Sequence, residues 1–234
     1  IDKHNNKFAG DKCIVATGGM SYETTGSTGD GYKFAEKMGH TVSKTYPSLV
    51  PFNIKEEMCK QLQGLSLKNV ALSAYAGGKI IYDEFGEMLF THFGISGPIA
   101  LSLSSLINRT DFRQVRLFLD FKPALDEETL DRRLLRLFDE QKNKTLRGAA
   151  ADLLPQKMIG AVLKQANIPQ EKRCNSVTKE ERARLLKALK AFEMQPLSLR
   201  DFSEAIVTSG GVDVSDITDS ERRACIGCVE PHFS

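Results

Sequence analysis

A glycine-rich segment near the start of the chain is the first place where the sequence could carry chemistry. Gly26, Gly29 and Gly31 alternate with Ser, Thr and Asp and lead into a helical pattern from Tyr32 to Met38. Glycines let a ligand approach the backbone, and a following helix offers free N–H groups and a positive dipole end. The spacing matches neither the dinucleotide fingerprint nor the P-loop, and Asp30 would repel a phosphate. On spacing alone, a purely structural turn is an equal alternative.

The second candidate is the segment Thr91-His92-Phe93-Gly94-Ile95-Ser96-Gly97-Pro98. Pro98 suits the first position of a helix and Ser96 or Gly97 its cap, so free N–H groups should face a loop in which a substrate anion could bind. Histidine titrates near neutral pH and can exchange protons with a substrate. We therefore predict His92 as catalytic and Ser96 and Gly97 as substrate-binding. The alternative is that His92 only hydrogen-bonds the loop backbone.

The third candidate is Cys225-Ile226-Gly227-Cys228, which is followed by His232. A closed zinc site needs four ligands, and the remaining cysteines, Cys13, Cys59 and Cys174, are single and distant in sequence. We therefore expect a chance pair of cysteines and no metal site.

Two segments near the ends of the chain predict the elements that position the glycine-rich segment. Lys12–Thr17 and Ala205–Thr208 are short runs rich in β-branched residues, and each is followed by a pair of glycines. Both predict buried strands, and we expect them in one sheet. Strand, glycine loop and helix in succession form one unit of an α/β sheet.

The middle of the chain has a different texture. Apolar residues alternate along Val70–Ala74 and Val115–Phe121, and a hairpin is expected around Glu84–Gly86, which together predict an antiparallel sheet or barrel. From Asp126 the period becomes helical, and Thr178–Glu181 reads as a capping box.

The predicted class is therefore α+β, in which an α/β sheet is interrupted by an antiparallel β insertion and a helical subdomain. We expect residues 1–48 and 199–219 in the α/β part, 49–125 in the β insertion, 126–198 in the helical subdomain and 220–234 as an irregular tail. Insertion of a domain into an exposed loop is physically easy.

Composition excludes few partners. The 234 residues carry 32 Lys and Arg against 30 Asp and Glu, a net charge of +2 that gives no global field for capturing nucleic acid. Between 172 and 190 a local basic run stands out, with seven basic residues against two acidic ones. No aromatic residue is interleaved, so we expect a solvated helix face and argue against a nucleic-acid partner. The alternative function is a non-enzymatic binding module that uses this basic face.

The segment Pro98–Ile107 is apolar over half the ~20 residues that a membrane span requires, and it carries three serines. We therefore predict no membrane partner and a cytoplasmic location, which the sparse, odd set of five cysteines also favours. The chain begins at Ile1 without a methionine, and we favour an excised fragment of a longer protein.

Four separate motifs, in order, resemble those of a known family: Ala16–Tyr22 with Thr25–Tyr32, Leu49–Pro51, Leu89–Pro98 and Ala205–Val212. The family is that of the bacterial aminoacetone-oxidase-like NAD(P)/FAD-dependent oxidoreductases, within the glutathione-reductase-like flavoproteins. The resemblance covers residues 13 to 217. It implies an FAD-binding sheet interrupted by a barrel-like and a helical insertion, a small-molecule substrate, FAD in the full-length parent, and NAD(P)H as a further candidate cofactor.

The resemblance also implies candidate cofactor contacts in the glycine-rich segment, namely Thr17, Gly18, Gly19, Thr28, Gly29 and Gly31. The family's N-terminal strand with its G-x-G-x-x-G loop and its C-terminal Gly-Glu segment have no counterpart in this sequence. Because the G-x-G-x-x-G loop holds the FAD pyrophosphate, we expect the chain alone to bind FAD weakly and to be inactive.

Overall fold

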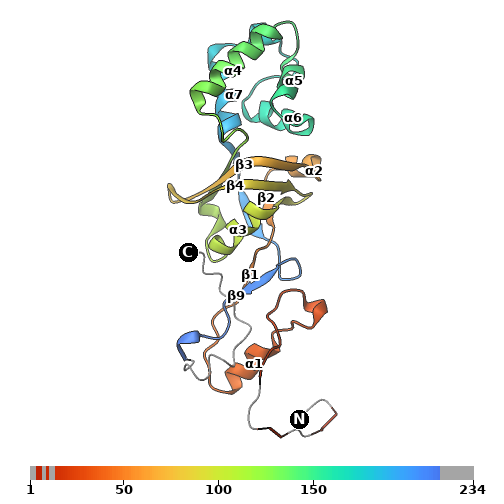
Figure 1. Ribbon diagram of the computed structural model, residues 1–234, viewed down its shortest axis with the longest axis vertical. Helices are drawn as coiled ribbons and strands as arrows, with labels where there is room; N and C mark the ends of the chain where they lie inside the picture. The colour runs from red at the N-terminus through yellow and green to blue at the C-terminus, as the bar shows by residue number, and fades with distance from the viewer. Residues whose placement is uncertain (1–3, 7–8, 11–13, 217–234) are drawn as a thin grey trace. The chain divides into compact units, whose positions relative to one another are not determined.

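The computed structural model describes residues 4–6, 9–10 and 14–216 (Figure 1). These residues form two compact units: Leu49–Arg200 is one, and the described residues on either side of it make up the other. Helices and antiparallel strands occur in both units. The predicted α+β class is therefore confirmed.

The larger unit is built on a seven-stranded sheet in which every pair of neighbours is antiparallel. Its edge strands, β7 and β8, are consecutive in the chain and are joined at Gln195, so the sheet curves back on itself as in a barrel. In sheet order the strands are β7 (Phe192–Met194), β6 (Val115–Asp120), β3 (Ser66–Ala76), β4 (Lys79–Phe90), β5 (Gly94–Ser96), β2 (Phe52–Ile54) and β8 (Pro196–Leu199).

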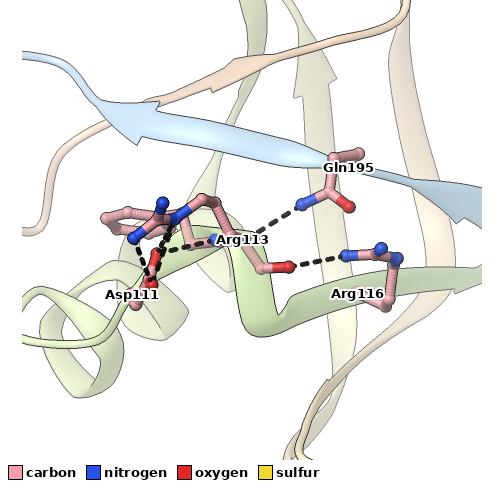
Figure 2. Close-up of polar contacts among 5 residues, drawn as sticks. Asp111, Arg113, Arg116 and Gln195 are labelled. Atoms are coloured by element: carbon pink, nitrogen blue, oxygen red, sulfur yellow. Dashed lines mark hydrogen bonds and ion pairs between the residues drawn. The ribbon is translucent and has the colours of Figure 1, made fainter.

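The side chain of Gln195 joins the two edges where the sheet meets itself (Figure 2). Its Nε2 donates at 3.0 Å to the backbone oxygens of Phe112, Val115 and Pro196. Phe112 belongs to a short 3-10 turn, η2 (Phe112–Gln114), directly before β6, so the amide ties the β7–β8 corner to the start of β6. The side-chain amide of Gln195, with its two N–H groups, thus supplies hydrogen bonds at a corner where the short edge strands β7 and β8 form no ladder with each other.

The long strands confirm the predicted alternation. In β3 the buried side chains are Leu67, Val70, Leu72 and Ala74, and in β6 they are Val115, Leu117 and Leu119. The predicted hairpin turn at Glu84–Gly86 is wrong, because β4 runs unbroken through these residues and the turn lies at Gly77 and Gly78. Both of these glycines have positive φ, which glycine adopts without strain.

Helices fill most of the stretch 126–190, which we call the helical subdomain, and their apolar side chains share one core with the barrel; residues 192–194 and 196–199 are strands β7 and β8 of the sheet. The capping box at Thr178 is confirmed: Thr178 Oγ1 accepts from Glu181 N at 3.3 Å, and Glu181 Oε2 accepts from Thr178 N at 2.8 Å. Helices α4 to α7 group together in Figure 1, apart from α3. The helices of this unit are α2 (Met58–Leu62), α3 (Pro98–Ile107), α4 (Glu127–Glu140), α5 (Leu146–Ala149), α6 (Gln156–Gln165) and α7 (Lys179–Lys190), with 3-10 turns η3 (Ala150–Asp152) and η4 (Cys174–Ser176).

Among its described residues, the smaller unit holds one helix and a two-stranded antiparallel sheet. The predicted helix is confirmed as α1 (Asp30–Lys37), which a 3-10 turn, η1 (Glu23–Thr25), precedes. The sheet pairs β1 (Tyr46–Ser48) with β9 (Val207–Ser209). A further turn, η5, covers Val214–Asp216.

The predicted strand that ends at Thr17 is wrong over its described residues, since 14–17 form no strand. The expectation that the segments around Val15 and Ile206 are strands of one sheet is therefore also wrong. Within the described chain, β9 takes β1 as its partner instead. A β-branched run becomes a strand only when a neighbouring strand supplies its hydrogen bonds, and here that neighbour lies after α1 rather than before it.

No described helix is both long enough and apolar enough to cross a membrane.

Candidate functional site

The six residues proposed as cofactor contacts lie together in the smaller unit, in the segment that leads into α1. Gly29 is the N-cap of α1 with φ 76°, and its N–H donates to the carbonyl oxygen of Gly19 at 3.1 Å, which closes the segment into a loop. Gly18 also has a positive φ, 71°. The segment therefore needs glycine at these two positions for its own backbone geometry.

Thr208 of β9 fixes this loop from the far end of the sequence. Its Oγ1 accepts from the backbone N–H of Met20 at 2.8 Å and of Ser21 at 3.2 Å, and it lies 3.0 Å from Ser21 Oγ. Ser21 is buried. β9 thus holds the loop through Thr208, so the glycine-rich motif and the motif Ala205–Val212 contact each other in the fold.

The glycines in this loop make room for neighbouring side chains. A Cβ atom at Gly19 would lie 2.6 Å from Thr208 Oγ1, and one at Gly31 would overlap Thr17 Oγ1. A Cβ at Gly18 would lie 2.7 Å from Ser27 Oγ. Neighbouring side chains of the protein therefore already occupy the space beside these glycines.

The N-terminus of α1 already carries an anion of its own. Asp30, the first residue of α1, accepts from Thr28 Oγ1 at 2.8 Å and from Lys33 Nζ at 2.9 Å. The hydrogen bonds from Lys33 and then Thr28 hold the pKa of Asp30 below its usual range. A carboxylate here repels a phosphate, so this loop does not fit the pyrophosphate of FAD.

The second candidate segment lies in the larger unit between β4 and α3, but the expected loop is interrupted by strand β5 at Gly94–Ser96. Its tight turn is closed by Thr91, whose N–H donates to the Gly94 oxygen at 2.8 Å and whose Oγ1 accepts from Gly94 N at 3.1 Å. Gly94 is buried in β5 against β2, where a Cβ would overlap the Phe52 oxygen and lie 2.8 Å from Ile54 N. Glycine is thus required at position 94, because β2 packs directly against its backbone.

His92 stands exposed on this turn, beside a stacked pair. Its ring meets the ring of Phe93 edge-on, with centroids 4.9 Å apart and planes at 76°. The guanidinium of Arg200 lies over the same Phe93 ring, 4.5 Å from its centroid. Arg200 N donates to the Pro51 oxygen at 2.9 Å, which fixes the arginine at the end of β8. Sequence analysis missed Arg200, because no local pattern connects it to the turn.

The start of α3 agrees with the prediction in part. Pro98 is its first residue, and Gly97, with φ 92° and no side-chain cap, is the N-cap. Ser96 lies one residue earlier, in β5 opposite Leu89, so it does not cap the helix. The first-turn N–H groups of α3 therefore have no side-chain acceptor at the cap.

Metal or thiol chemistry has no support in the part of the chain that the structure describes. No group of His, Cys, Asp or Glu within that part could hold a metal ion. Cys59 and Cys174 are buried and free, and burial followed by the charge of Glu56 raises the pKa of Cys59 to about 11. Such a thiol is a poor nucleophile. Cys13 and the Cys225–Cys228 pair with His232 lie outside the described residues.

The basic run between 172 and 190 is used largely to hold the helical subdomain together. Lys172 binds Glu181 at 2.7 Å, and Arg182 binds Asp131 of α4 at 2.7 Å. Arg184 Nε donates to the Ala166 oxygen at 2.8 Å. Lys190 pairs with Asp120 at 2.6 Å and also donates to two backbone oxygens. Four of the seven cations in this run are thus occupied by the fold itself.

The class of this protein is defined by an antiparallel barrel joined to a helical subdomain. In the sequence, both lie between the two segments of the smaller unit. Residues 46–207 match the family model described as the HI0933-like protein barrel and H2TH domain, and the chain belongs to the HI0933-like family.

Curated relatives extend this result. The chain is 29% identical over 224 residues to a ribosomal RNA dihydrouridine synthase of Escherichia coli, a match that covers 96% of this chain and 54% of that protein. It is 30% identical over 207 residues to the protein of the same name from Haemophilus influenzae, covering 88% and 48%. It is 25% identical over 219 residues to a 3-dehydro-bile acid delta(4,6)-reductase of Clostridium scindens, covering 93% and 53%. The chain spans about half the length of these relatives.

Proposed function

We propose that this chain is part of an FAD-dependent oxidoreductase that reduces a C=C bond conjugated to a carbonyl group, and that its substrate is a uridine in RNA. The observation that carries the proposal is the family match over residues 46–207 together with the names of the relatives. The alternative of a non-enzymatic module that uses the basic run loses support, because four of its seven cations are occupied by the fold.

The two kinds of relative are named for one kind of reaction. Dihydrouridine is uridine with two hydrogens added to a ring C=C bond that is conjugated to a carbonyl. A delta(4,6)-reductase acting on a 3-dehydro-bile acid likewise saturates a C=C bond conjugated to a ketone. Such a reduction breaks one π bond and forms two C–H bonds, one from a hydride equivalent and one from a proton. The shared chemistry supports the reaction class even though the substrates differ.

The RNA substrate is favoured over the steroid by the number and identity of the relatives. Two proteins from different organisms, at 29% and 30% identity, carry the RNA name, against one at 25% for the bile acid. An RNA substrate differs from the small molecule that we expected from the sequence. In the sequence, only the basic run between 172 and 190 was a candidate nucleic-acid surface.

The described residues take distinct parts in this proposal. His92, exposed on the turn before α3, is our candidate proton donor, and Ser96 and Gly97 remain our candidates for substrate contact. Thr17, Gly18, Gly19, Thr28, Gly29 and Gly31 form a closed loop, so we propose that they border the cofactor at most and that the FAD pyrophosphate is bound by a segment outside this chain. NAD(P)H is our candidate electron donor.

The experiment that tests the proposal uses the complete protein that contains this chain. We expect it to be purified with a flavin absorbance spectrum and, given NAD(P)H, to form dihydrouridine in ribosomal RNA isolated from a strain that lacks the gene. Mass spectrometry of RNA digests measures the product. A flavin-containing protein that reduces a conjugated steroid ketone but no RNA would replace the substrate while keeping the reaction class. A protein without flavin and without either activity would overturn the proposal.

A further inference from the structure

The outer face of the barrel carries aromatic side chains where strands normally present polar ones to water. On β3 and β6 alternate side chains are buried, while Tyr75, Phe118 and, in register with Ala71, Phe85 of β4 lie on the opposite side. Phe85 is 63% exposed and Tyr75 37%. Ile81, next to Tyr82 on β4, is 39% exposed. Large exposed apolar groups gathered on one sheet face mark an interaction surface.

The strand register places these rings around a floor of small side chains. Phe118 lies opposite Ser73 and Phe85 opposite Ala71, so the middle strand β3 separates the two phenylalanines. Neighbouring strands are about 4.8 Å apart, which puts β4 and β6 about 10 Å apart. The rings of Tyr75 and Phe118 meet edge-on, with centroids 5.4 Å apart at 87°. Phe85 and Tyr75 are thus exposed on the same face of the sheet as Ala71 and Ser73, and Phe118 is partly buried there.

Cations lie at both ends of the aromatic strip that Tyr75, Phe85 and Phe118 form. Arg116, opposite Tyr75, is held by the Arg113 oxygen at 3.1 Å, as Figure 2 shows, and its Nε lies 3.6 Å from Glu193. Beyond the other end of β6 lie Lys122 and Arg133, both half-buried.

Neither Lys122 nor Arg133 has an acidic partner within the described chain, whereas Lys190 beside them is paired with Asp120. Burial and then the charge of Arg133 lower the pKa of Lys122. Two half-buried like charges without a counterion are unfavourable until an anion joins them. The register also places three acids among the rings: Asp83 accepts from Ser73 Oγ at 2.8 Å, Asp120 is paired with Lys190, and Glu193 is paired with Arg116.

We propose that this face binds a single-stranded segment of RNA, with bases stacking on Tyr75, Phe118 and Phe85 and backbone phosphates neutralised by Lys122 and Arg133. Aromatic side chains on a sheet are a common base-stacking platform, and cations along its edge follow the backbone. The proposal rests on the proposed function for the choice of RNA as the nucleic acid. It assigns recognition to the barrel rather than to the basic run between 172 and 190.

Charge decides between RNA and a second copy of the chain as the occupant. An interface between two copies would bury apolar rings, but the acids that the strand register places among these rings, Asp83, Asp120 and Glu193, are already bound by Ser73, Lys190 and Arg116. A polyanion with planar bases satisfies both the rings and the cations.

The first test measures binding of a fluorescein-labelled single-stranded oligouridine to the 234-residue chain by fluorescence anisotropy. We expect Phe85→Leu, which keeps the apolar volume but removes the ring, to weaken binding by about 5-fold or more, and Phe85→Tyr to retain it. Leu197→Ala, at a similarly exposed position on β8, is the matched control and should bind like the wild type. Circular dichroism verifies that each variant is folded.

The second test measures the salt dependence of the same binding. Lys122→Ala and Arg133→Ala should each reduce the slope of log K against log salt by about 0.7, the value for one phosphate of a single strand. Lys187→Ala, exposed on α7, should leave the slope unchanged. Equal effects of all three variants, or none, would remove Lys122 and Arg133 as phosphate contacts and overturn the proposal.

The outcomes separate this inference from the proposed function. No binding of the oligouridine by the folded chain, or Phe85→Leu binding as tightly as Phe85→Tyr, overturns the aromatic platform while leaving reductase activity of the complete protein untouched. A chain that is dimeric by light scattering and becomes monomeric on Phe85→Ser assigns the face to self-association and also overturns it. Loss of binding confined to the ring-removing and phosphate variants supports it.

Discussion

At the scale of single residues, Gln195 connects several parts of the larger unit through hydrogen bonds. Its side-chain amide satisfies backbone oxygens of Phe112, Val115 and Pro196, while its N–H donates to Glu56 Oε2 at 3.1 Å and its oxygen accepts from Lys55 N at 2.9 Å. One residue thus joins four segments at the corner where the sheet meets itself.

We predict that Gln195→Ala lowers the free energy of unfolding by about 1–3 kcal/mol, since carbonyl groups at this corner lose their donor. Urea denaturation followed by circular dichroism measures the change. Gln63→Ala, at an exposed glutamine after α2, is the control and should shift the midpoint little. A Gln195→Ala variant as stable as the wild type would show that water replaces the amide without loss.

A second prediction at this scale concerns His92 in the complete protein. We expect His92→Ala to lower turnover by about 100-fold or more, as the loss of a general acid does, with an unchanged flavin spectrum and melting temperature. The side chain is exposed and touches Phe93 edge-on, so its removal creates no cavity. His40→Ala, on the loop after α1, is the matched control. Undiminished turnover in His92→Ala would retire His92 as the proton donor.

At the scale of elements, the helical subdomain depends on the pairing between Lys172 and the capping box of α7. Lys172 and Glu181 lie 2.7 Å apart with side chains only 23% and 14% exposed. The hydrogen bond from Lys172, followed by that from the Thr178 backbone, holds the pKa of Glu181 below its usual range. The charged carboxylate is therefore favoured in the folded state.

A lowered pKa in the folded state adds stability at pH values above the unfolded pKa of about 4.3, and this stability is lost as the pH falls through the folded value. We predict that Glu181→Gln, which keeps an oxygen for the Thr178 N–H, is less stable than the wild type at pH 7 and that the difference shrinks toward pH 3. Thermal melts across this range measure it. Glu171→Gln, exposed beside Lys172, should give no such convergence, and a constant gap for Glu181→Gln would contradict the prediction.

At the scale of the whole molecule, the chain carries a barrel with a helical core and a glycine-rich loop whose space is filled by its own side chains. We therefore predict that the 234-residue chain does not retain FAD through gel filtration, because Asp30 occupies the first turn of α1 and the loop glycines pack against Thr17, Ser27 and Thr208. Absorbance at the flavin wavelengths in the protein peak measures retention. Stoichiometric FAD in that peak would contradict both the prediction and our interpretation of the loop.

Local physics in the sequence determined the elements that depend on near neighbours. The capping box at Thr178, the start of α3 at Pro98 and the alternation in β3 and β6 follow from hydrogen bonds and side-chain periods within a few residues, and all three were predicted. The four ordered motifs likewise indicated membership of a known family, and the family shown for residues 46–207 is the HI0933-like one.

Only the tertiary structure decided the features that join distant segments. The pairing of β9 with β1, the hold of Thr208 on the glycine loop, the stacking of Arg200 on Phe93 and the closure at Gln195 each depend on groups that fold together from far apart in sequence. No pattern within one segment encodes its partner, because a hydrogen bond or ring contact is specified by both sides at once. For the same reason β4 runs through the residues that alone resembled a turn: its ladder with β3 outweighs the local preference at Gly86.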